Sequence, residues 1–349
     1  MKSQELCKPS MLIPQQGYWF WIVARRSIPS VVFFLGLNLT LIGCGTQSQS
    51  QSVKQLPLCA KQEKVRIGYQ KGGMDLLVLK ARGNLEKRLA SAGCIVQWSS
   101  FTTGPPLIEA LGAGGLDLGW TGAPPPIFAQ VANRPIVYIA TSPRNDKGTG
   151  ILVSKNSPIR RITDLKGKKV AVTKGTARHY VLLKTLESAG LKLDDVQLVY
   201  LLPPDARLAF EQGKVDAAVF VDPIFAELER TGKARILADG RAGEQRNFYL
   251  ATRAFAEQHP ELSKVFIEQQ QQESQWAKNH LPEVAKLVAK DTKVNIATWQ
   301  WILERRPIFG VESIDEKIIA QQQQIADVFY SLKLLPKRVV VKEAVWNSK

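Results

Sequence analysis

Four short segments of the chain combine residue types that can hold a small anion. They lie at 70–74, 121–125, 173–177 and 221–223, and each joins an apolar stretch typical of a β-strand to a stretch typical of a helix. A turn of this kind leaves free backbone N–H groups at the start of the helix, where their partial positive charge attracts an anion. One such turn is common in α/β proteins, so the repetition is the informative feature. We therefore predict an anion-binding cleft toward which these turns point.

Side chains in and near the turns supply the candidate binding groups. Gln70 offers a neutral amide, and Thr121 and Thr176 offer hydroxyls. Arg253 follows the last predicted crossing and could hold an anion by a bidentate contact, or form a salt bridge between lobes. The remaining candidates, which would contribute backbone N–H groups or a nearby positive charge, are Gly72, Gly73, Gly122, Lys174 and Gly175. Together these residues form the predicted ligand site.

Asp222 is an ambiguous member of the predicted site, because a carboxylate repels an anion. It can cap a helix that has Pro223 as its first residue, or it can pair with the cationic part of a zwitterionic ligand. Arg178 and His179 fall in the first turn of another predicted helix and can face either the cleft or solvent. These alternatives stay open at the level of the sequence.

The elements that position these residues alternate between strand and helix. Strands are expected at 65–69, 95–101, 116–120, 136–140, 151–154, 170–172, 196–200, 215–221 and 247–252. One amphipathic helix is predicted over 74–92, and the chain from Phe255 onward is predicted to be almost wholly helical. The glutamine runs at 269–272 and 321–324 are interpreted as solvated faces of such helices.

Two polar, glycine-containing breaks, at 142–150 and 238–246, divide this α/β pattern into two blocks. A chain that crosses twice between the blocks gives lobe I from residues 64–145 and 247–349, and lobe II from residues 146–246. Two α/β lobes joined in this way can place all four turns around one cleft. Closure of the lobes would then trap the anion.

The first 43 residues are interpreted as a signal peptide. A basic pair precedes an apolar run at 28–42, which is short for a membrane-spanning helix. Leu41–Cys44 resembles a bacterial lipobox, which predicts cleavage before Cys44 and a lipid on that cysteine; an ordinary signal with an incidental cysteine is the alternative. Residues 44–63, rich in Gln and Ser, would form a flexible tether. These features predict an exported protein anchored on the periplasmic side of the membrane.

The remaining cysteines, Cys59 and Cys94, flank the first strand–helix unit. In an oxidising compartment they can pair in a disulfide or stay as two separate buried thiols, and both interpretations remain open. No His/Cys spacing suggests a metal site, the chain has 3 histidines, and no cofactor is expected.

The net charge of +16 favours anionic ligands or anionic lipid surfaces, with simple solubility as the alternative. Lys and Arg are spread along the chain, and no nucleic-acid-binding motif accompanies them. Nucleic acid is therefore excluded as a partner.

A series of segments then recurs in the order and spacing of one family. They are IGYQKGG, LKARGNLEKRL, GPPLIEALGAGGLDLGWTGAPPPIFAQ, VYIA, SPI, DLKGKKVAVTKGTARHY, GKVDA followed by DP, and NFYLATRAFAEQHPEL. Over roughly residues 64 to 336 the chain resembles the substrate-binding proteins of ABC importers for aliphatic sulfonates, which are close to the nitrate- and taurine-binding proteins.

The resemblance implies a two-lobed, type II periplasmic-binding fold with a mixed sheet in each lobe and hinge closure. It also implies a non-enzymatic monomer that delivers a small sulfonate-like organic anion to a membrane permease. One departure is visible: residues 217–221 read AAVFV, where sulfonate binders usually carry tryptophans that line the cleft. The ligand could therefore be nitrate, taurine or another small solute. The rival functions are an enzyme of the thiamine-pyrimidine type on the same fold and a sensory module.

Overall fold

The computed structural model describes residue 59 and residues 63–243, 246–307 and 309–346. The predicted signal peptide, the lipidation at Cys44 and nearly all of the predicted tether lie outside the described residues. Within the described ranges, no helix is both long enough and apolar enough to cross a membrane.

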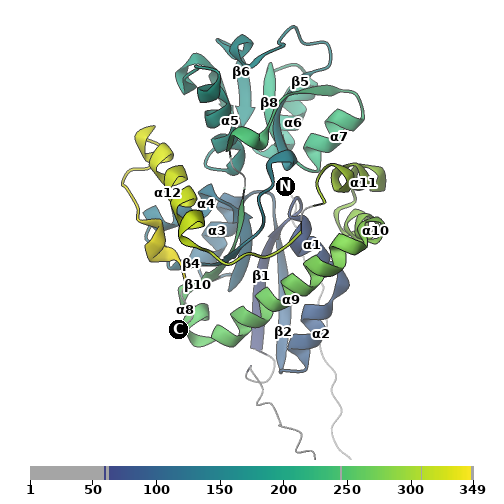
Figure 1. Cartoon of the computed structure of the whole chain (residues 1–349), viewed down its shortest axis with the longest axis vertical. Coiled ribbons are helices and arrows are strands. Elements are labelled where there is room, and N and C mark those ends of the chain that lie inside the picture. The colour runs from purple at the N-terminus through teal and green to yellow at the C-terminus, as the bar shows by residue number, and fades with distance from the viewer. Residues whose placement is uncertain (1–58, 60–62, 244–245, 308, 347–349) are drawn as a thin grey trace, which may run out of the picture. The chain divides into compact units, whose positions relative to one another are not determined.

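Two five-stranded mixed sheets form the framework of the fold (Figure 1). The first sheet has the strand order β2-β1-β3-β10-β4, and the second has the order β7-β6-β8-β5-β9. The strand that is antiparallel to its neighbours is β10 in the first sheet and β5 in the second. The strand bounds are β1 Glu63–Gln70, β2 Cys94–Phe101, β3 Leu118–Gly122, β4 Ile136–Thr141, β5 Thr149–Ser154, β6 Lys169–Val172, β7 Gln197–Tyr200, β8 Ala217–Val221, β9 Ala234–Asp239 and β10 Asn247–Thr252. The predicted α/β fold with two mixed sheets is confirmed.

Helices follow most strands, and a run of helices completes the chain. Their bounds are α1 Met74–Arg82, α2 Asn84–Ala90, α3 Gly104–Gly112, α4 Pro124–Val131, α5 Ala177–Ser188, α6 Pro203–Glu211, α7 Ile224–Arg230, α8 Arg253–Gln258, α9 Pro260–Asn279, α10 Leu281–Thr292, α11 Ile296–Arg305 and α12 Glu316–Ser331. Short 3₁₀ turns occupy Asp146–Gly148, Ile162–Leu165, Leu193–Asp195, Gly240–Gly243 and Val341–Ala344.

The crossings between the sheets fall at the two predicted breaks. One connects β4 to β5 and the other connects β9 to β10. The strands β1–β4 and β10, which fall in predicted lobe I, form the first sheet, and β5–β9, which fall in predicted lobe II, form the second. The assignment of whole lobes, with their helices, stays a prediction.

The single helix predicted over 74–92 is wrong. Gly83 adopts a left-handed conformation with φ of 65°, and it ends α1 and starts α2. Side chains with a Cβ avoid this conformation, so glycine allows the chain to change direction there. The two helices consequently lie on the first sheet as separate segments.

The interpretation of both glutamine runs as solvated is also wrong. Gln270 and Gln322 are 1% and 2% exposed. The Gln270 amide donates to Ser274 Oγ at 3.2 Å, whereas the Gln322 amide donates to Ala123 O at 2.7 Å and to Tyr138 Oη at 3.0 Å. One side of each run turns into the protein, where these hydrogen bonds offset the cost of burying an amide.

Each sheet is covered on both faces by apolar side chains. In β6, Val170 and Val172 join one buried cluster of the second sheet, whereas Ala171 joins the cluster on the other face. This alternation follows from the two-residue period of a strand. The same arrangement in the first sheet buries Phe266 and Trp299 in one cluster and Phe329 in the other.

Cys59 and Cys94 are joined by a disulfide, with their Cα atoms 5.3 Å apart. The sequence left open a disulfide or two separate thiols, and the structure contains the disulfide. The bond ties the segment before β1 to the first residue of β2.

Candidate functional site

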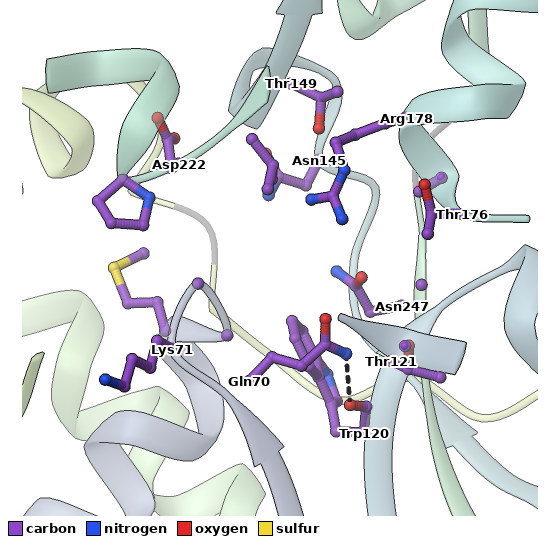
Figure 2. A pocket seen from close by; sticks show the side chains of 18 of the residues that line it. Gln70, Lys71, Trp120, Thr121, Asn145, Thr149, Thr176, Arg178, Asp222 and Asn247 are labelled. Carbon is purple, nitrogen blue, oxygen red and sulfur yellow. Dashed lines mark hydrogen bonds between the residues drawn. The ribbon is translucent and has the colours of Figure 1, made fainter. Parts of the chain in front are cut away.

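A cavity of about 270 Å³ is lined by the ends of strands from both sheets and by the turns that follow them (Figure 2). It contains most of the residues predicted from the sequence to bind a ligand. The predicted residues that line it are Gln70, Gly72, Gly73, Thr121, Gly122, Thr176 and Asp222. Turns more than 150 residues apart thus meet at one place, as the repeated turn pattern predicted. The binding role of each residue stays a prediction.

Glycine is required where the two sheets approach each other across the cavity. A Cβ on Gly72 would lie 2.6 Å from the backbone oxygen of Asp222, and a Cβ on Gly122 would lie 3.1 Å from Cβ of Ala177. Any larger residue at position 72 would push the two turns apart. The glycines of the predicted site therefore set the spacing of its walls.

Three predicted ligand residues do not line the cavity. Lys174 Nζ lies over the ring of Tyr200, 5.5 Å from its centre, and the Gly175 N–H donates to Nδ1 of His179 at 3.3 Å. Both residues belong to the turn before α5, and the Lys174 side chain is exposed to solvent. Neither residue is part of the cavity lining, and their roles in ligand binding stay predictions.

Arg253 lies at the wrong end of its strand. β10 begins at Asn247, which lines the cavity, and Arg253 follows the last residue of that strand, about 20 Å farther along an extended chain. Its guanidinium donates to Glu343 O at 3.3 Å and lies 3.9 Å from Glu257. Among the described residues Arg253 forms no ion pair with lobe II, and its predicted contact with an anion stays a prediction.

Arg178 is a buried cation of the cavity lining. It is the second residue of α5, its side chain is directed into the cavity in Figure 2, and it is 8% exposed. Among the described residues, no carboxylate forms an ion pair with Arg178, and its Nε has no hydrogen-bond partner. Burial lowers the pKa of this guanidinium to about 10, so it remains positively charged at neutral pH. The sequence placed Arg178 in a first helical turn but did not decide which way it faces.

Thr176 does not use its hydroxyl as predicted. The hydroxyl donates to Thr173 O at 2.7 Å and makes no capping bond to α5. Its proton is therefore committed within the turn. The groups left for an anion at this helix start are the free backbone N–H groups and the Arg178 guanidinium.

Polar side chains from strand ends and from the crossings also line the cavity. Thr121 is 1% exposed, and its hydroxyl has no partner among the described residues; the same holds for Oδ1 of Asn145. Gln70 donates to Trp120 O at 3.2 Å, which fixes its amide at the rim of the first sheet. The sequence pattern missed Ser142, Asn145 and Asn247, because the first two lie in a segment that it marked only as a crossing and Asn247 begins a predicted strand.

Asp222 is fully buried and fully paired. Arg305 Nη2 donates to its Oδ1 and Arg306 Nε donates to its Oδ2, both at 2.7 Å. The N–H of Ala226 also donates to Oδ1 at 3.2 Å, so the carboxylate holds the first turn of α7 in place. The helix begins one residue later than predicted, at Ile224, and the Asp222–Pro223 bond is cis. With its oxygens occupied, Asp222 has little capacity left for a cationic ligand.

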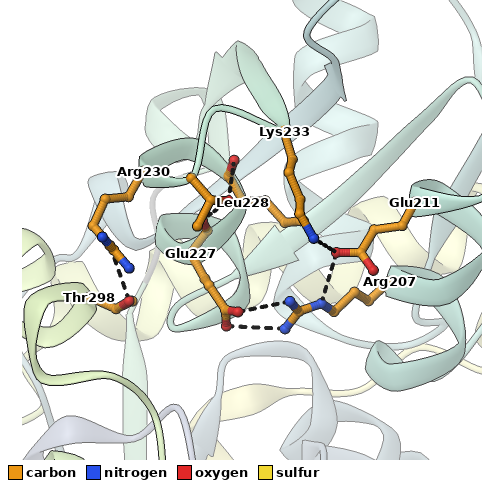
Figure 3. A network of polar contacts seen from close by, with 8 residues as sticks. Arg207, Glu211, Glu227, Leu228, Arg230, Lys233 and Thr298 are labelled. Atoms are coloured by element: carbon orange, nitrogen blue, oxygen red, sulfur yellow. Dashed lines mark hydrogen bonds and ion pairs between the residues drawn. The ribbon is translucent and has the colours of Figure 1, made fainter.

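A network of charged side chains fixes α7 beside the cavity (Figure 3). Arg207 of α6 makes a two-pronged contact with Glu227 of α7, with distances of 3.1 and 2.8 Å. On the other side of the helix, Arg230 Nε donates to Thr298 Oγ1 of α11 at 3.3 Å. Arg305 Nη1 adds a contact to Glu229 at 2.7 Å. α7 is therefore held between α6 and α11.

Comparisons with known proteins agree with this architecture. A family model described as NMT1/THI5 like matches residues 103–285. The chain belongs to this family. A "Putative aliphatic sulfonates-binding protein" of Escherichia coli (strain K12) is 39% identical over 286 residues, which cover 82% of this chain and 89% of that protein. A protein of the same name from Bacillus subtilis (strain 168) is 32% identical and covers 91% of this chain and 94% of its own length.

Solved structures place the fold among the periplasmic binding proteins. The alkanesulfonate-binding protein SsuA from Xanthomonas axonopodis pv. citri, bound to MOPS, matches with a TM-score of 0.79 and 35% identity over 83% of this chain and 100% of that chain. The periplasmic aliphatic sulphonate binding protein SsuA from Escherichia coli matches with a TM-score of 0.76 and 38% identity, over 82% and 98% of the two chains. The fold implied by the sequence resemblance is thus confirmed.

Proposed function

We propose that the chain is the solute-binding component of an ABC importer and that it captures an aliphatic sulfonate in the cavity. The observation that carries the proposal is Arg178, a buried guanidinium directed into the cavity without a protein carboxylate as its partner. A buried charge without a partner is costly, so a ligand anion would stabilise this arrangement. The names of the relatives support a sulfonate as that anion.

The chemistry of a sulfonate suits the groups around Arg178. A sulfonate carries one delocalised negative charge at neutral pH and three oxygens that accept hydrogen bonds. A guanidinium can donate to two of these oxygens, and the free N–H groups at the start of α5 or the hydroxyl of Thr121 can donate to the third. The second hydrogen of the Gln70 amide is also free for a ligand, since only one is used by Trp120 O.

The organic tail would pack against the apolar part of the lining. Residues 217–221 form β8, and Val221 at its end lines the cavity in place of the tryptophans expected in this region. The apolar lining comes instead from Trp120, Pro125, Pro143, Pro223, Ile224 and Val294. This wall suits an aliphatic chain, whose burial contributes about 0.8 kcal/mol per CH₂ group.

In this proposal lobe I (64–145 and 247–349) and lobe II (146–246) close around the ligand by bending at the two crossings. The chain is exported, and a lipid on Cys44 holds it beside the membrane permease to which it delivers the sulfonate. The chain itself catalyses no reaction, and the ATPase of the importer supplies the energy for transport.

Calorimetric titration with pentanesulfonate, taurine and nitrate tests the proposal. We expect the wild-type chain to bind pentanesulfonate. The affinity of the Arg178→Met variant should be lower by a factor of about 100 at least, because two charge-assisted hydrogen bonds are lost. Arg253→Met is the matched control, since it removes the same charge from a residue outside the cavity, and it should bind as the wild type does.

Three results would count against the proposal. Equal affinities for the Arg178→Met variant and the wild type would remove Arg178 from the site. Binding of nitrate without any sulfonate would replace the ligand but keep the role in transport. A wild-type chain that is folded and binds none of the three anions would overturn the proposed function.

A further inference from the structure

A second buried charged side chain lines the cavity without a full set of partners. Asp75 is the second residue of α1 and is 8% exposed, and its Oδ1 has no hydrogen-bond partner among the described residues. The backbone N–H groups of Asp75 itself and of Gly310 favour the ionised form of this carboxyl group. Nothing in the proposed anion contact uses this carboxyl group. It is therefore free to receive another part of a ligand.

Asp75 does not serve as the counter-ion of a positively charged side chain among the described residues. Arg306 attracts the Asp75 carboxylate through space, but Arg306 Nε is bonded to Asp222, and no ion pair joins Asp75 to any cation in the described ranges. The other groups that face Asp75 are uncharged: Tyr249 of β10, and the Gln270 amide of α9, which donates to the backbone oxygen of Asp75 at 3.4 Å.

An aromatic side chain, Trp120, lies beside the start of the helix that carries Asp75. The indole of Trp120 packs against the turn that leads into α1, since a Cβ on Gly73 would lie 2.5 Å from its Cζ3. Trp120 and Asp75 both line the cavity. A cavity lined by both a carboxylate and an indole is a favourable environment for an ammonium group, because both attract positive charge.

Asp75 and Arg178 lie on helices that follow strands of different sheets, α1 after β1 and α5 after β6. Lys71, which precedes α1 by three residues, and Arg178 of α5 lie on opposite sides of the cavity in Figure 2. The exposed Lys71 side chain lies at the edge of the lining, whereas Asp75 is buried within it. The cavity thus has one buried positive group on α5 and one buried negative group on α1. Asp222 adds no net negative charge, since two arginines pair with it.

We propose that Asp75 and Trp120 form a subsite for the ammonium group of a zwitterionic aminosulfonate, so that the cavity selects such ligands over simple alkanesulfonates. The inference rests on the proposed function, in which Arg178 holds the sulfonate. It names the chemical class of the ligand and the residue that sets the preference.

The subsite makes the preference dependent on pH. Burial raises the pKa of Asp75 to about 7, against the opposing effects of Arg306 and the backbone N–H groups. Arg178 keeps its charge between pH 6 and 8, and burial raises the pKa of Tyr249 well above its usual value, so that Tyr249 stays neutral. Above pH 7 the ionised Asp75 attracts an ammonium group and repels a simple anion. The ratio of the two affinities should therefore rise between pH 6 and 8.

The test compares 3-aminopropanesulfonate with butanesulfonate, which has a methyl group in place of the ammonium group. Calorimetry uses the full chain as wild type, as Asp75→Asn and as Glu283→Gln, a control that removes an exposed carboxylate from α10. At pH 8 we expect the wild type and the control to prefer the aminosulfonate about tenfold or more, and we expect Asp75→Asn to lose that preference. Retention of butanesulfonate binding by Asp75→Asn would show that the variant is folded.

The outcomes separate this inference from the proposed function. If the wild type binds both sulfonates equally, or if Asp75→Asn keeps the wild-type preference, the subsite is overturned while sulfonate capture stands. If the wild type binds neither sulfonate, both are overturned. Should Asp75→Asn fail to fold, the wild-type affinity ratio decides: a rise between pH 6 and 8 supports the subsite, and an unchanged ratio overturns it.

Discussion

Two walls of the cavity, one on α5 and one on α7 and α11, differ in whether their buried charges are paired among the described residues. On the α5 wall, formed by Thr176, Ala177 and Arg178, the guanidinium has no carboxylate partner. On the α7–α11 wall, formed by Asp222, Pro223 and Arg306, the carboxylate receives two guanidiniums at 2.7 Å each.

The difference separates a structural charge from a charge that is available to a ligand. Desolvation penalises both groups, and each needs an opposite charge or several hydrogen bonds to offset that cost. Asp222 obtains them from α11 and so joins two parts of the fold. Arg178 obtains none from the described part of the chain, and a ligand can supply them. If only burial and position in the cavity lining were considered, Asp222 and Arg178 would be equally good candidates for binding a ligand.

The largest effect should come from breaking the paired charge. Asp222→Asn leaves Arg305 and Arg306 without their shared carboxylate, and we expect the free energy of unfolding to fall by about 3–5 kcal/mol. Chemical denaturation measures this change. The exposed Asp194→Asn substitution serves as the control and should alter stability by less than about 0.5 kcal/mol. A loss for Asp222→Asn no greater than that of the control would contradict the structural role of the pair.

A smaller effect, which depends on pH, should come from His179 on the α5 wall. Burial, with the charge of Lys174, lowers the pKa of His179 to about 4, below its value of 6.5 in an unfolded chain. The folded state therefore favours the neutral imidazole. Its contribution to stability is complete above pH 6.5 and is lost as the pH falls toward 4, by up to about 3 kcal/mol.

Unfolding free energies of the wild type and His179→Asn at pH 7 and pH 4.5 check this expectation. The variant loses the edge-to-face contacts of the ring with Tyr200 and Phe329, so it should be less stable at pH 7. The difference between the two proteins should nevertheless shrink at pH 4.5. A difference that is the same at both pH values would exclude His179 as its source.

The smallest effects should distinguish two threonines of the cavity. Thr176 donates its hydroxyl to Thr173 O, whereas the hydroxyl of Thr121 has no partner among the described residues. Thr176→Val should therefore lower the free energy of unfolding by about 1 kcal/mol and leave sulfonate affinity nearly unchanged. Thr121→Val should do the reverse, with about a fivefold loss of affinity and no loss of stability. Chemical denaturation and calorimetry on both variants measure the two quantities, and an exchange of the two results would contradict the assignment.

Much of the fold follows from local sequence patterns. The apolar alternation of 65–69, the proline-started helices at 105 and 124, and the breaks at 142–150 and 238–246 all correspond to observed elements or crossings. Such patterns are local, because the period of a strand or helix and the backbone preferences of Gly and Pro act within a few residues. The candidate site followed from the same reasoning, since strand ends of one sheet meet at a common edge.

The sequence by itself determined which turns start helices at strand ends, and hence where a cleft for an anion had to form. Only the tertiary structure decided which charges are free in that cleft. The partners of Asp222 lie more than 80 residues away along the chain, and Arg253 lies at the far end of the strand that Asn247 begins. Whether Arg178 or Gln270 faces solvent or the interior likewise depends on what packs against its helix. Pairing and burial are set by long-range contacts, and a local pattern does not contain them.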